Sequence, residues 1–282
     1  MQKYLNLLRD VRDNGQKRFT RSGVVYSVFD RKIEFDMREH FPAPTTKRLM
    51  WKAMVGELLW FLNGKNDLTS LRHYSDLDDD AWTIWTDDCK RWHEASEREC
   101  DKEDLGKLYG HQWRNVGGDQ IAKLVHKMIH DKNSRYQIVM AWNPEDIDND
   151  EMALAPCHLG FTVYVDGNEF DLKWRQRSVD TFLGLPFNIA SYGLLMHILG
   201  KITGLTPRRL IGDLDDVHIY HDHLDAVNEQ LSRVPEEDPD RLPQVVLPDI
   251  NWLHDLVDLT AKDFTLINYR PQPAIPAKLS VG

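Results

Sequence analysis

The chain has 282 residues, of which 41% are hydrophobic and 28% are charged, and its formal net charge is −10. These proportions are those of a globular protein and exclude disordered and fibrous classes, and the negative charge argues against non-specific binding of DNA. A small anionic ligand is still compatible with this charge if arginines gather locally.

Cysteines and apolar runs indicate the compartment. The three cysteines, Cys89, Cys100 and Cys157, are an odd number at irregular spacing, unlike a secreted disulfide framework. The N-terminus lacks a continuous apolar segment, so we expect no secretory signal, and no run approaches ~18 apolar residues. We therefore expect a soluble, cytoplasmic protein with no membrane partner, in the host cytoplasm if its source is viral. No linker divides the chain, so we expect one domain over residues 1–282.

The first elements are a helix and strands. Residues 3–14 carry apolar side chains at helical spacing and are followed by Gly15, which suits a C-terminal cap. Residues 24–36 alternate well enough to form strands, and Arg21 precedes them in a loop beside Gly23. From position alone, such an arginine is a solvated surface group.

Residues 47–63 form a helix that is apolar nearly all round, and such a helix must be buried. Glu57 lies in its middle. A buried carboxylate either finds a partner or stays protonated, and both outcomes suit proton transfer at a site. A structural pairing with an arginine is an equally good interpretation of this glutamate from the residues alone.

Residues 76–104 begin with an acidic run and continue with tryptophans among scattered charges, which predicts a surface insertion or a mobile loop. Cys89 and His93 lie one helical turn apart, but no further pair completes a set of four metal ligands. The histidines between 218 and 223 are divided between the two faces of a strand. We therefore predict no metal site.

The remaining framework is regular. It comprises a helix over 119–131, a strand over 137–142, helices over 187–203 and from 222 towards 233, and a charged, proline-rich loop over 235–243.

A β-hairpin is predicted in the centre of the chain. Residues 159–165 and 170–174 are rich in β-forming side chains and flank Asp166-Gly167-Asn168.

The register of this hairpin decides what faces Cys157. A three-residue loop, with Asn168 in the left-handed conformation, sets Cys157 opposite Arg177, whereas a two-residue loop sets it opposite Gln176. We prefer the three-residue loop because it gives the cysteine a cation. A guanidinium favours the thiolate, which is the nucleophilic form of the side chain.

Cys157 has two interpretations. A lone cysteine on a strand is more often a small buried apolar group. The balance changes because a dense polar set lies in the same stretch, and polar groups in an apolar neighbourhood are costly unless a ligand or each other satisfies them. That set is His158, Arg175, Gln176, Arg177, Ser178, Asp180 and Asn188. We therefore take Cys157 as the candidate nucleophile.

These residues belong to ordered motifs. They are Ala155-Pro156-Cys157-His158, Gln176-Arg177-Ser178-Val179-Asp180 and the run from Phe182 to Tyr192. Further motifs lie at 45–48, 57–62, 109–114 and 216–220. Together they resemble the folate-dependent thymidylate synthase family over nearly the whole chain.

The resemblance implies an α/β (α+β) fold with a large mixed, mostly antiparallel sheet and helices packed on one side. It also implies a homodimer formed through the other face of the sheet. The implied enzyme is a methyltransferase of nucleotide biosynthesis that moves the one-carbon unit of 5,10-methylenetetrahydrofolate to C5 of dUMP. Because C5 is a poor nucleophile, attack of Cys157 on C6 first makes C5 enolate-like, so covalent catalysis splits one hard step into easier ones.

The resemblance assigns roles to individual residues. The implied catalytic set is Cys157, Glu57, Tyr109, His158, Asn188 and Arg177. The implied dUMP-binding set is Arg21, Arg177, Gln176, Ser178, Asp180, Asn188, His218 and Tyr220, with Arg135 supplied by the partner subunit of the dimer. The implied folate-binding set is Ile84, Trp85, Leu154, Asp180, Gly184, Phe187 and Val281.

Asn188 indicates the base. Its side-chain amide can offer a donor to uracil O4 and an acceptor to N3–H, whereas an aspartate would suit cytosine. We therefore expect dUMP as the substrate.

Departures from the family pattern keep two alternatives open. Tyr136 follows Arg135 where a second arginine is usual, Thr86-Asp87 follow Trp85, Asp215 replaces a usual glycine, and the tail ends one residue late. If water captured the one-carbon unit, the product would be 5-hydroxymethyl-dUMP with tetrahydrofolate, as in a hydroxymethylase. A non-catalytic homologue that binds nucleotide or RNA is the other alternative. We put methyl transfer first.

Overall fold

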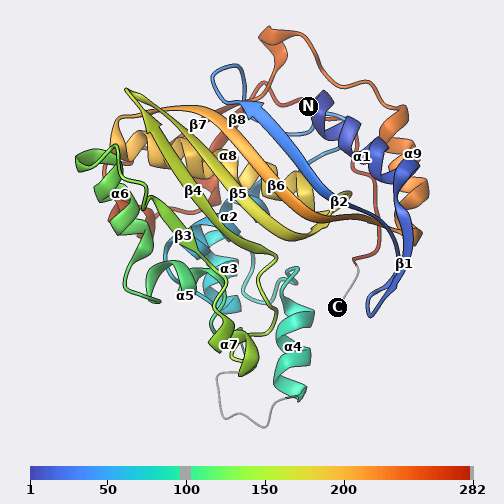
Figure 1. Cartoon of the computed structure of the whole chain (residues 1–282), viewed down its shortest axis with the longest axis horizontal. Helices are drawn as coiled ribbons and strands as arrows, with labels where there is room; N and C mark the ends of the chain where they lie inside the picture. Colours follow the sequence, from blue (N-terminus) through green and yellow to red (C-terminus); the bar gives the residue numbers. More distant parts are fainter. Residues whose placement is uncertain (96–102, 280–282) are drawn as a thin grey trace.

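The fold is described from a computed structural model, in which residues 1–95 and 103–279 are described. A six-stranded sheet crosses the molecule, and helices α2 (Trp51–Leu62) and α8 (Gly184–Thr203) lie behind it in Figure 1. Buried hydrophobic side chains of these helices and of the strands form a continuous cluster. The core therefore lies between the sheet and its helices.

The sheet has the strand order β1-β2-β6-β5-β4-β3. The strands are β1 (Gln16–Thr20), β2 (Gly23–Asp36), β6 (Thr206–Tyr220), β5 (Glu169–Asp180), β4 (His158–Asp166) and β3 (Ile138–Met140). Strands β5 and β6 are parallel, and the other neighbouring pairs are antiparallel. A two-stranded sheet pairs β7 (Gln244–Val246) with β8 (Thr265–Ile267). The expected mixed, mostly antiparallel sheet is confirmed.

Helices α2 and α8 are apolar on almost every side, so only burial can accommodate them. The structure buries both, as the sequence predicts, and α8 ends at Gly204 in the left-handed conformation (φ 71°). The other helices are α1 (Gln2–Asn14), α3 (Leu68–Tyr74), α4 (Thr86–Ala95), α5 (Tyr109–Arg114), α6 (Gln120–His130), α7 (Pro144–Asp148) and α9 (Leu224–Ser232). No helix within the described ranges is long and apolar enough to span a membrane.

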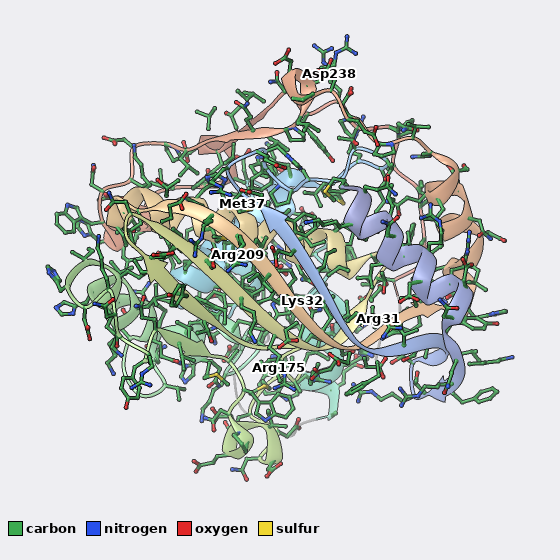
Figure 2. The ribbon with its side chains drawn as sticks, turned by 45° about the horizontal axis from the view of Figure 1, so that its top comes forward. Arg31, Lys32, Met37, Arg175, Arg209 and Asp238 are labelled. Carbon is green, nitrogen blue, oxygen red and sulfur yellow. The ribbon has the colours of Figure 1, made fainter. Side chains whose placement is uncertain are left out.

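The other face of the sheet exposes alternate side chains. Figure 2 labels Lys32, Arg175 and Arg209 on strands β2, β5 and β6. Register places Arg175 beside Asp213, which in turn lies beside Lys32, so charges of opposite sign alternate across the strands. Apolar side chains are exposed nearer β3 and β4; they are Tyr136, Ile138, Met140 and Tyr164.

The loop of the central hairpin differs from our prediction. Asp166 pairs with Glu169, so the loop has two residues and not three. Gly167, and not Asn168, takes the positive φ of 61°. A glycine adopts this conformation without a steric penalty, which explains why the shorter loop forms.

A β-bulge nevertheless restores the predicted partner of Cys157. The register between β4 and β5 shifts by one residue between His158 and Gly160, which leaves Leu159 as the extra residue. Beyond the bulge, the backbone N–H of Arg177 donates to the carbonyl oxygen of Cys157 at 2.9 Å. The predicted loop was wrong, but the predicted juxtaposition of Cys157 and Arg177 is present.

For residues 76–104 we predicted a surface insertion or a mobile loop, and the mobile loop is wrong for residues 85–95. Residues Thr86–Ala95 form α4, and Trp85, Cys89 and Trp92 are buried. These three positions are spaced by four and three residues, which places them on one side of a helix. The surrounding charges obscure this stripe in the sequence. Cys100, part of the metal pattern considered above, lies outside the described residues, and no group within the described residues could hold a metal ion.

Candidate active site

A pocket of about 370 Å³ lies where the β1–β2 turn, the start of α4 and the ends of β5 and β6 meet. It brings together many residues that the sequence predicted to bind substrate or act on it. They are Arg21, Cys157, Arg177, Ser178, His218 and Tyr220. The pocket therefore combines a thiol, two guanidinium groups and three side chains that can hydrogen-bond a hydroxyl group.

Cys157 lies just before β4 and is a free thiol. Burial raises its pKa above the ordinary value, while the charge of Arg177 acts in the opposite direction. The predicted effect of Arg177 on the thiol is present, although the effect of burial is larger. Two carboxylates, Asp88 and Asp180, raise the thiol pKa further.

The guanidinium of Arg177 is held in place by the segment that carries the nucleophile. Its Nε–H donates to the carbonyl oxygen of Pro156 at 2.9 Å, and Nη2 donates to that of Ala155 at 3.1 Å. The group also lies 5.4 Å from the centre of the Trp142 ring. A guanidinium has five N–H groups, so donors remain for an anionic ligand.

Tyr109, on α5, fixes the backbone of the nucleophile. Its hydroxyl oxygen accepts the backbone N–H groups of Cys157 at 2.7 Å and of His158 at 3.3 Å. Burial raises the pKa of Tyr109 well above its ordinary value, so its hydroxyl keeps its proton. That proton is available to a ligand or a water molecule.

His158 is a neutral imidazole at neutral pH. Burial lowers its pKa to about 4, and a contact with Asn188 opposes this shift. Its Nδ1 lies 3.3 Å from the hydroxyl of Tyr192. His158 can therefore take part in a hydrogen-bond network without adding a charge to the site.

A chain of hydrogen bonds orients the amide of Asn188. The indole N–H of Trp174 can only donate, and it meets Oε1 of Gln176 at 3.2 Å. Nε2 of Gln176 then donates to the carbonyl oxygen of Ser178 and to Oδ1 of Asn188, each at 3.0 Å. Because an indole and a peptide carbonyl each have one role, the orientation of both amides follows, and Nδ2 of Asn188 is the donor left for a ligand.

Glu57 is a proton-holding group. Its Oε1 accepts the indole N–H of Trp85 at 2.7 Å. Burial raises the pKa of Glu57 to about 7, and the bond from Trp85 lowers it against that trend. The partner is thus an indole and not the structural arginine that the sequence left open. A carboxyl group that titrates near neutral pH can both donate and accept a proton there.

Asp180 caps the turn into α8. Its Oδ1 accepts the backbone N–H groups of Phe182 at 3.0 Å and Leu183 at 3.1 Å. Gly184 lies at the start of that helix, where an added Cβ would lie 3.6 Å from the Cβ of Asp180. The second oxygen of Asp180 is not used in these bonds and can face a ligand.

A second pocket, of about 500 Å³, extends from Glu57 towards α3. Its walls are mainly apolar, and they include the predicted folate-binding residues Ile84, Trp85 and Phe187. Leu154 lines the first pocket instead. The first pocket is therefore polar and contains the candidate nucleophile Cys157, and the second is apolar and contains the carboxyl group of Glu57.

Seven predicted residues among those described line neither pocket; they are Tyr109, Arg135, His158, Gln176, Asp180, Gly184 and Asn188. Arg135 is exposed in the segment before β3 and lines neither pocket of its own chain. Val281 lies outside the described residues.

The sequence did not predict roles for Asp88 and Asp216, both of which line the first pocket. Asp216 accepts the hydroxyl of Ser27 at 2.7 Å and lies 3.3 Å from Nδ1 of His218, and these contacts hold its pKa at about 2. It therefore orients His218. The alternation of β6 puts Asp216 and His218 on one side of the strand, a signal that could have identified this pair.

Comparisons with known proteins agree with the geometry. The sequence model of the thymidylate synthase family matches residues 2–281. A probable thymidylate synthase of Escherichia phage T5 is 49% identical over 286 residues, which cover 99% of this chain and 100% of the relative. The thymidylate synthase of Enterobacteria phage T4 is 38% identical, with 100% of both chains covered. The crystal structure of thymidylate synthase from T4 phage superposes with a TM-score of 0.91 at 37% identity over 100% of both chains.

Proposed function

The chain belongs to the thymidylate synthase family, and from this membership we propose that it converts dUMP and 5,10-methylenetetrahydrofolate into dTMP and dihydrofolate. The observation that carries the proposal is the free thiol of Cys157 in a pocket with Arg21 and Arg177, next to an apolar pocket that contains Glu57. This arrangement suits covalent attack on an anionic nucleotide by a thiolate.

The polar pocket is the proposed site of dUMP. Arg21 and Arg177 would bind the phosphate, for which a guanidinium offers paired N–H donors. His218 and Tyr220, at the end of β6, would bind the deoxyribose hydroxyl group. Cys157 would then attack C6 of the base, which turns C5 into the nucleophile that accepts the one-carbon unit.

The orientation of Asn188 supports uracil as the base. Its Nδ2 is the donor left over by the bond between its Oδ1 and Gln176, and uracil presents an acceptor, O4, at the corresponding ring position. Cytosine presents an amino group there, which would leave two donors opposed. A buried polar group without a partner costs about 1 to 3 kcal/mol, enough to favour dUMP over dCMP.

The apolar pocket is the proposed site of the folate. Aromatic and aliphatic walls such as Trp85 and Phe187 suit the flat rings of this co-substrate, and the second oxygen of Asp180 could accept N–H groups of the pterin. Glu57 would hold or release the proton that the reaction moves, because its pKa of about 7 keeps both forms populated.

We also propose a homodimer in the cytoplasm, formed through the exposed face of the sheet. Exposed apolar side chains on and beside strands β3 and β4, including Tyr136, Met140 and Tyr164, suit such an interface. Arg135 is exposed and lines neither of the two site pockets of its own chain, so a phosphate role requires that it reach the partner's site. A reducing compartment would keep Cys157 a free thiol.

Product analysis tests the proposed reaction. The purified protein is incubated with methylenetetrahydrofolate and labelled dUMP, and both the folate and the pyrimidine products are identified. We expect dTMP with dihydrofolate, and no turnover by Cys157→Ser. Formation of 5-hydroxymethyl-dUMP with tetrahydrofolate would replace the proposal with a hydroxymethylase, and binding of dUMP without turnover would point to a non-catalytic homologue.

Mixing two inactive variants tests the shared site. Arg135→Ala should lose dUMP turnover because its own sites lack the partner's cation, and Cys157→Ser should lose the nucleophile. A mixed dimer pairs an intact Cys157 with an intact Arg135 at one of its two sites, so exchange of subunits should restore activity. If the mixture stays inactive although sedimentation shows mixed dimers, Arg135 does not act across the interface.

A further inference from the structure

Asp88 is a partly buried carboxylate of the active-site pocket that has no role in the proposed reaction. It lies in the first turn of α4 and lines the same pocket as Arg21, Cys157 and Arg177. Its side chain is 14% exposed and forms an ion pair with Arg91, one turn further along the helix. The adjacent Asp87, by contrast, is exposed and is not part of the pocket lining.

The charges around Asp88 connect it with both the anion site and the nucleophile. Burial raises the pKa of Asp88, the cations Arg91 and Arg21 lower it, and Asp87 raises it. In the other direction, the charge of Asp88 raises the pKa of the Cys157 thiol. The charge of Asp88 thus acts both on Arg21, the proposed phosphate-binding residue, and on Cys157, the proposed nucleophile.

We propose that the negative charge of Asp88 weakens the binding of phosphate at Arg21 and reduces the reactivity of Cys157. Arg91 sets how strongly Asp88 acts, because the ion pair between them draws part of the negative charge away from Arg21. The inference rests on the proposed function in that it takes the phosphate of a nucleotide as the ligand of Arg21.

Weaker phosphate binding and a less reactive thiol can both be useful to the enzyme. Phosphate contacts are the same for the nucleotide substrate and for the nucleotide product, so they are uniform binding, which lowers KM without raising kcat. Excess affinity would slow the release of product, which limits many enzymes. A less ionised thiol also reacts more slowly with oxidants and alkylating agents.

Variants of the two partners should have opposite effects. Asp88→Asn should bind dUMP and inorganic phosphate about three- to tenfold more tightly, because one like charge is removed from the lining of the pocket that contains Arg21, and the gain should shrink as salt is added. Its Cys157 should react with iodoacetamide faster by a similar factor at neutral pH. Arg91→Gln should bind both anions more weakly and react more slowly, because Asp88 then loses its outer partner.

The readouts are calorimetric titration of the full-length protein and mass analysis of the alkylated Cys157 peptide, which separates this thiol from the other cysteines. Asp87→Asn is the matched control, since it removes the same formal charge from the same turn outside the pocket, and it should bind like the wild type. Thermal melts of all variants show that each is folded.

The inference is overturned if Asp88→Asn leaves phosphate affinity and alkylation rate unchanged, or if Asp88→Asn and Arg91→Gln shift them in the same direction, as loss of a merely structural ion pair would. Failure of the proposed function has a different signature. In that case the wild-type protein does not bind dUMP, whereas the response to inorganic phosphate still tests Asp88.

Discussion

The candidate active site has two walls that are built differently. On the sheet wall, functional groups are fixed by bonds that strands and α8 provide, as when Gln176 orients Asn188 and the backbone of Arg177 pairs with that of Cys157. On the α4 wall, Trp85 and Asp88 come from a segment outside the sheet and are held by side-chain contacts with Glu57 and Arg91. We infer that the sheet wall determines which ligand atoms are recognised, while the α4 wall adjusts protonation and charge.

The largest effect is expected at the centre of the sheet wall. Cys157→Ser should reduce turnover by more than about 10³-fold, because a hydroxyl is a far weaker nucleophile than a thiolate, while Arg21 and Arg177 still bind the phosphate. Steady-state rates and the dissociation constant of dUMP measure the two effects separately. Substantial turnover by the variant would remove Cys157 from its role, and loss of binding would mean that the thiol is structural.

A change of specificity is the next largest effect. Asn188→Asp replaces the donor that faces position 4 of the base by an acceptor, so preference should move from dUMP towards dCMP by about 10²-fold or more. The ratio of kcat/KM for the two nucleotides measures the shift. An equal loss with both nucleotides would show that Asn188 supports the site without reading the base.

The sheet wall was largely predictable from the sequence, because its residues lie in ordered motifs whose strands fix their spacing. The length of the hairpin loop was predicted wrongly, yet Gly160 carried a signal for the bulge that corrects the register. Its φ is 157°, and an added Cβ would lie 2.4 Å from the carbonyl oxygen of Val139. A glycine inside a strand often marks such a bulge or a close backbone approach.

The α4 wall was not predictable in the same way. Trp85, Cys89 and Trp92 are buried at helical spacing, but the segment between and around them contains many charged residues, which suggest an exposed segment. The burial depends on tertiary contacts, such as the bond from Trp85 to Glu57 and that from the indole of Trp92 to the carbonyl oxygen of Asp150 at 3.3 Å. Sequence periodicity alone does not contain these partners, which lie far away in the chain.

Glu57 contacts Trp85 of the α4 wall, and Glu57→Gln should lower turnover by about 10²-fold through loss of proton transfer.

The same variant should also change the pH dependence of stability. The pKa of Glu57 is about 7 in the folded protein and 4.5 for an ordinary glutamate, so the stability of the wild type falls as pH rises between these two values, by roughly 3 kcal/mol in total. The glutamine variant lacks this loss, so its stability relative to wild type should increase between about pH 5 and about pH 8. Urea unfolding at one fixed protein concentration measures the difference, and a constant difference would contradict the raised pKa.

Trp174→Phe tests the orientation of Asn188 at a smaller scale. The variant keeps an aromatic ring but removes the N–H that bonds to Gln176. The amide of Gln176 is then held only by the carbonyl oxygen of Ser178, so the preference for dUMP over dCMP should fall severalfold. Trp60→Phe is the matched control, because Trp60 is also fully buried and its N–H has no partner among the described residues. Both variants should lose stability to a comparable extent. An equal nucleotide preference in the two variants would show that the indole N–H of Trp174 does not act on Asn188.

The smallest effect is expected from Trp85→Phe, which changes the contact between the walls and leaves both in place. The indole N–H lowers the pKa of Glu57 against the effect of burial, so its removal should raise that pKa. The limb of the pH–rate profile that belongs to Glu57, identified by its absence in Glu57→Gln, should therefore move to higher pH. The direction of the shift does not depend on whether the protonated or the ionised form is active, since either limb follows the same pKa.

The smaller ring of Phe should also weaken folate binding by a few fold, but that change alone would leave the limb of the pH–rate profile where it is. A limb at the wild-type position would mean that the α4 wall packs against Glu57 without adjusting its protonation, and the division of tasks between the walls would then fail.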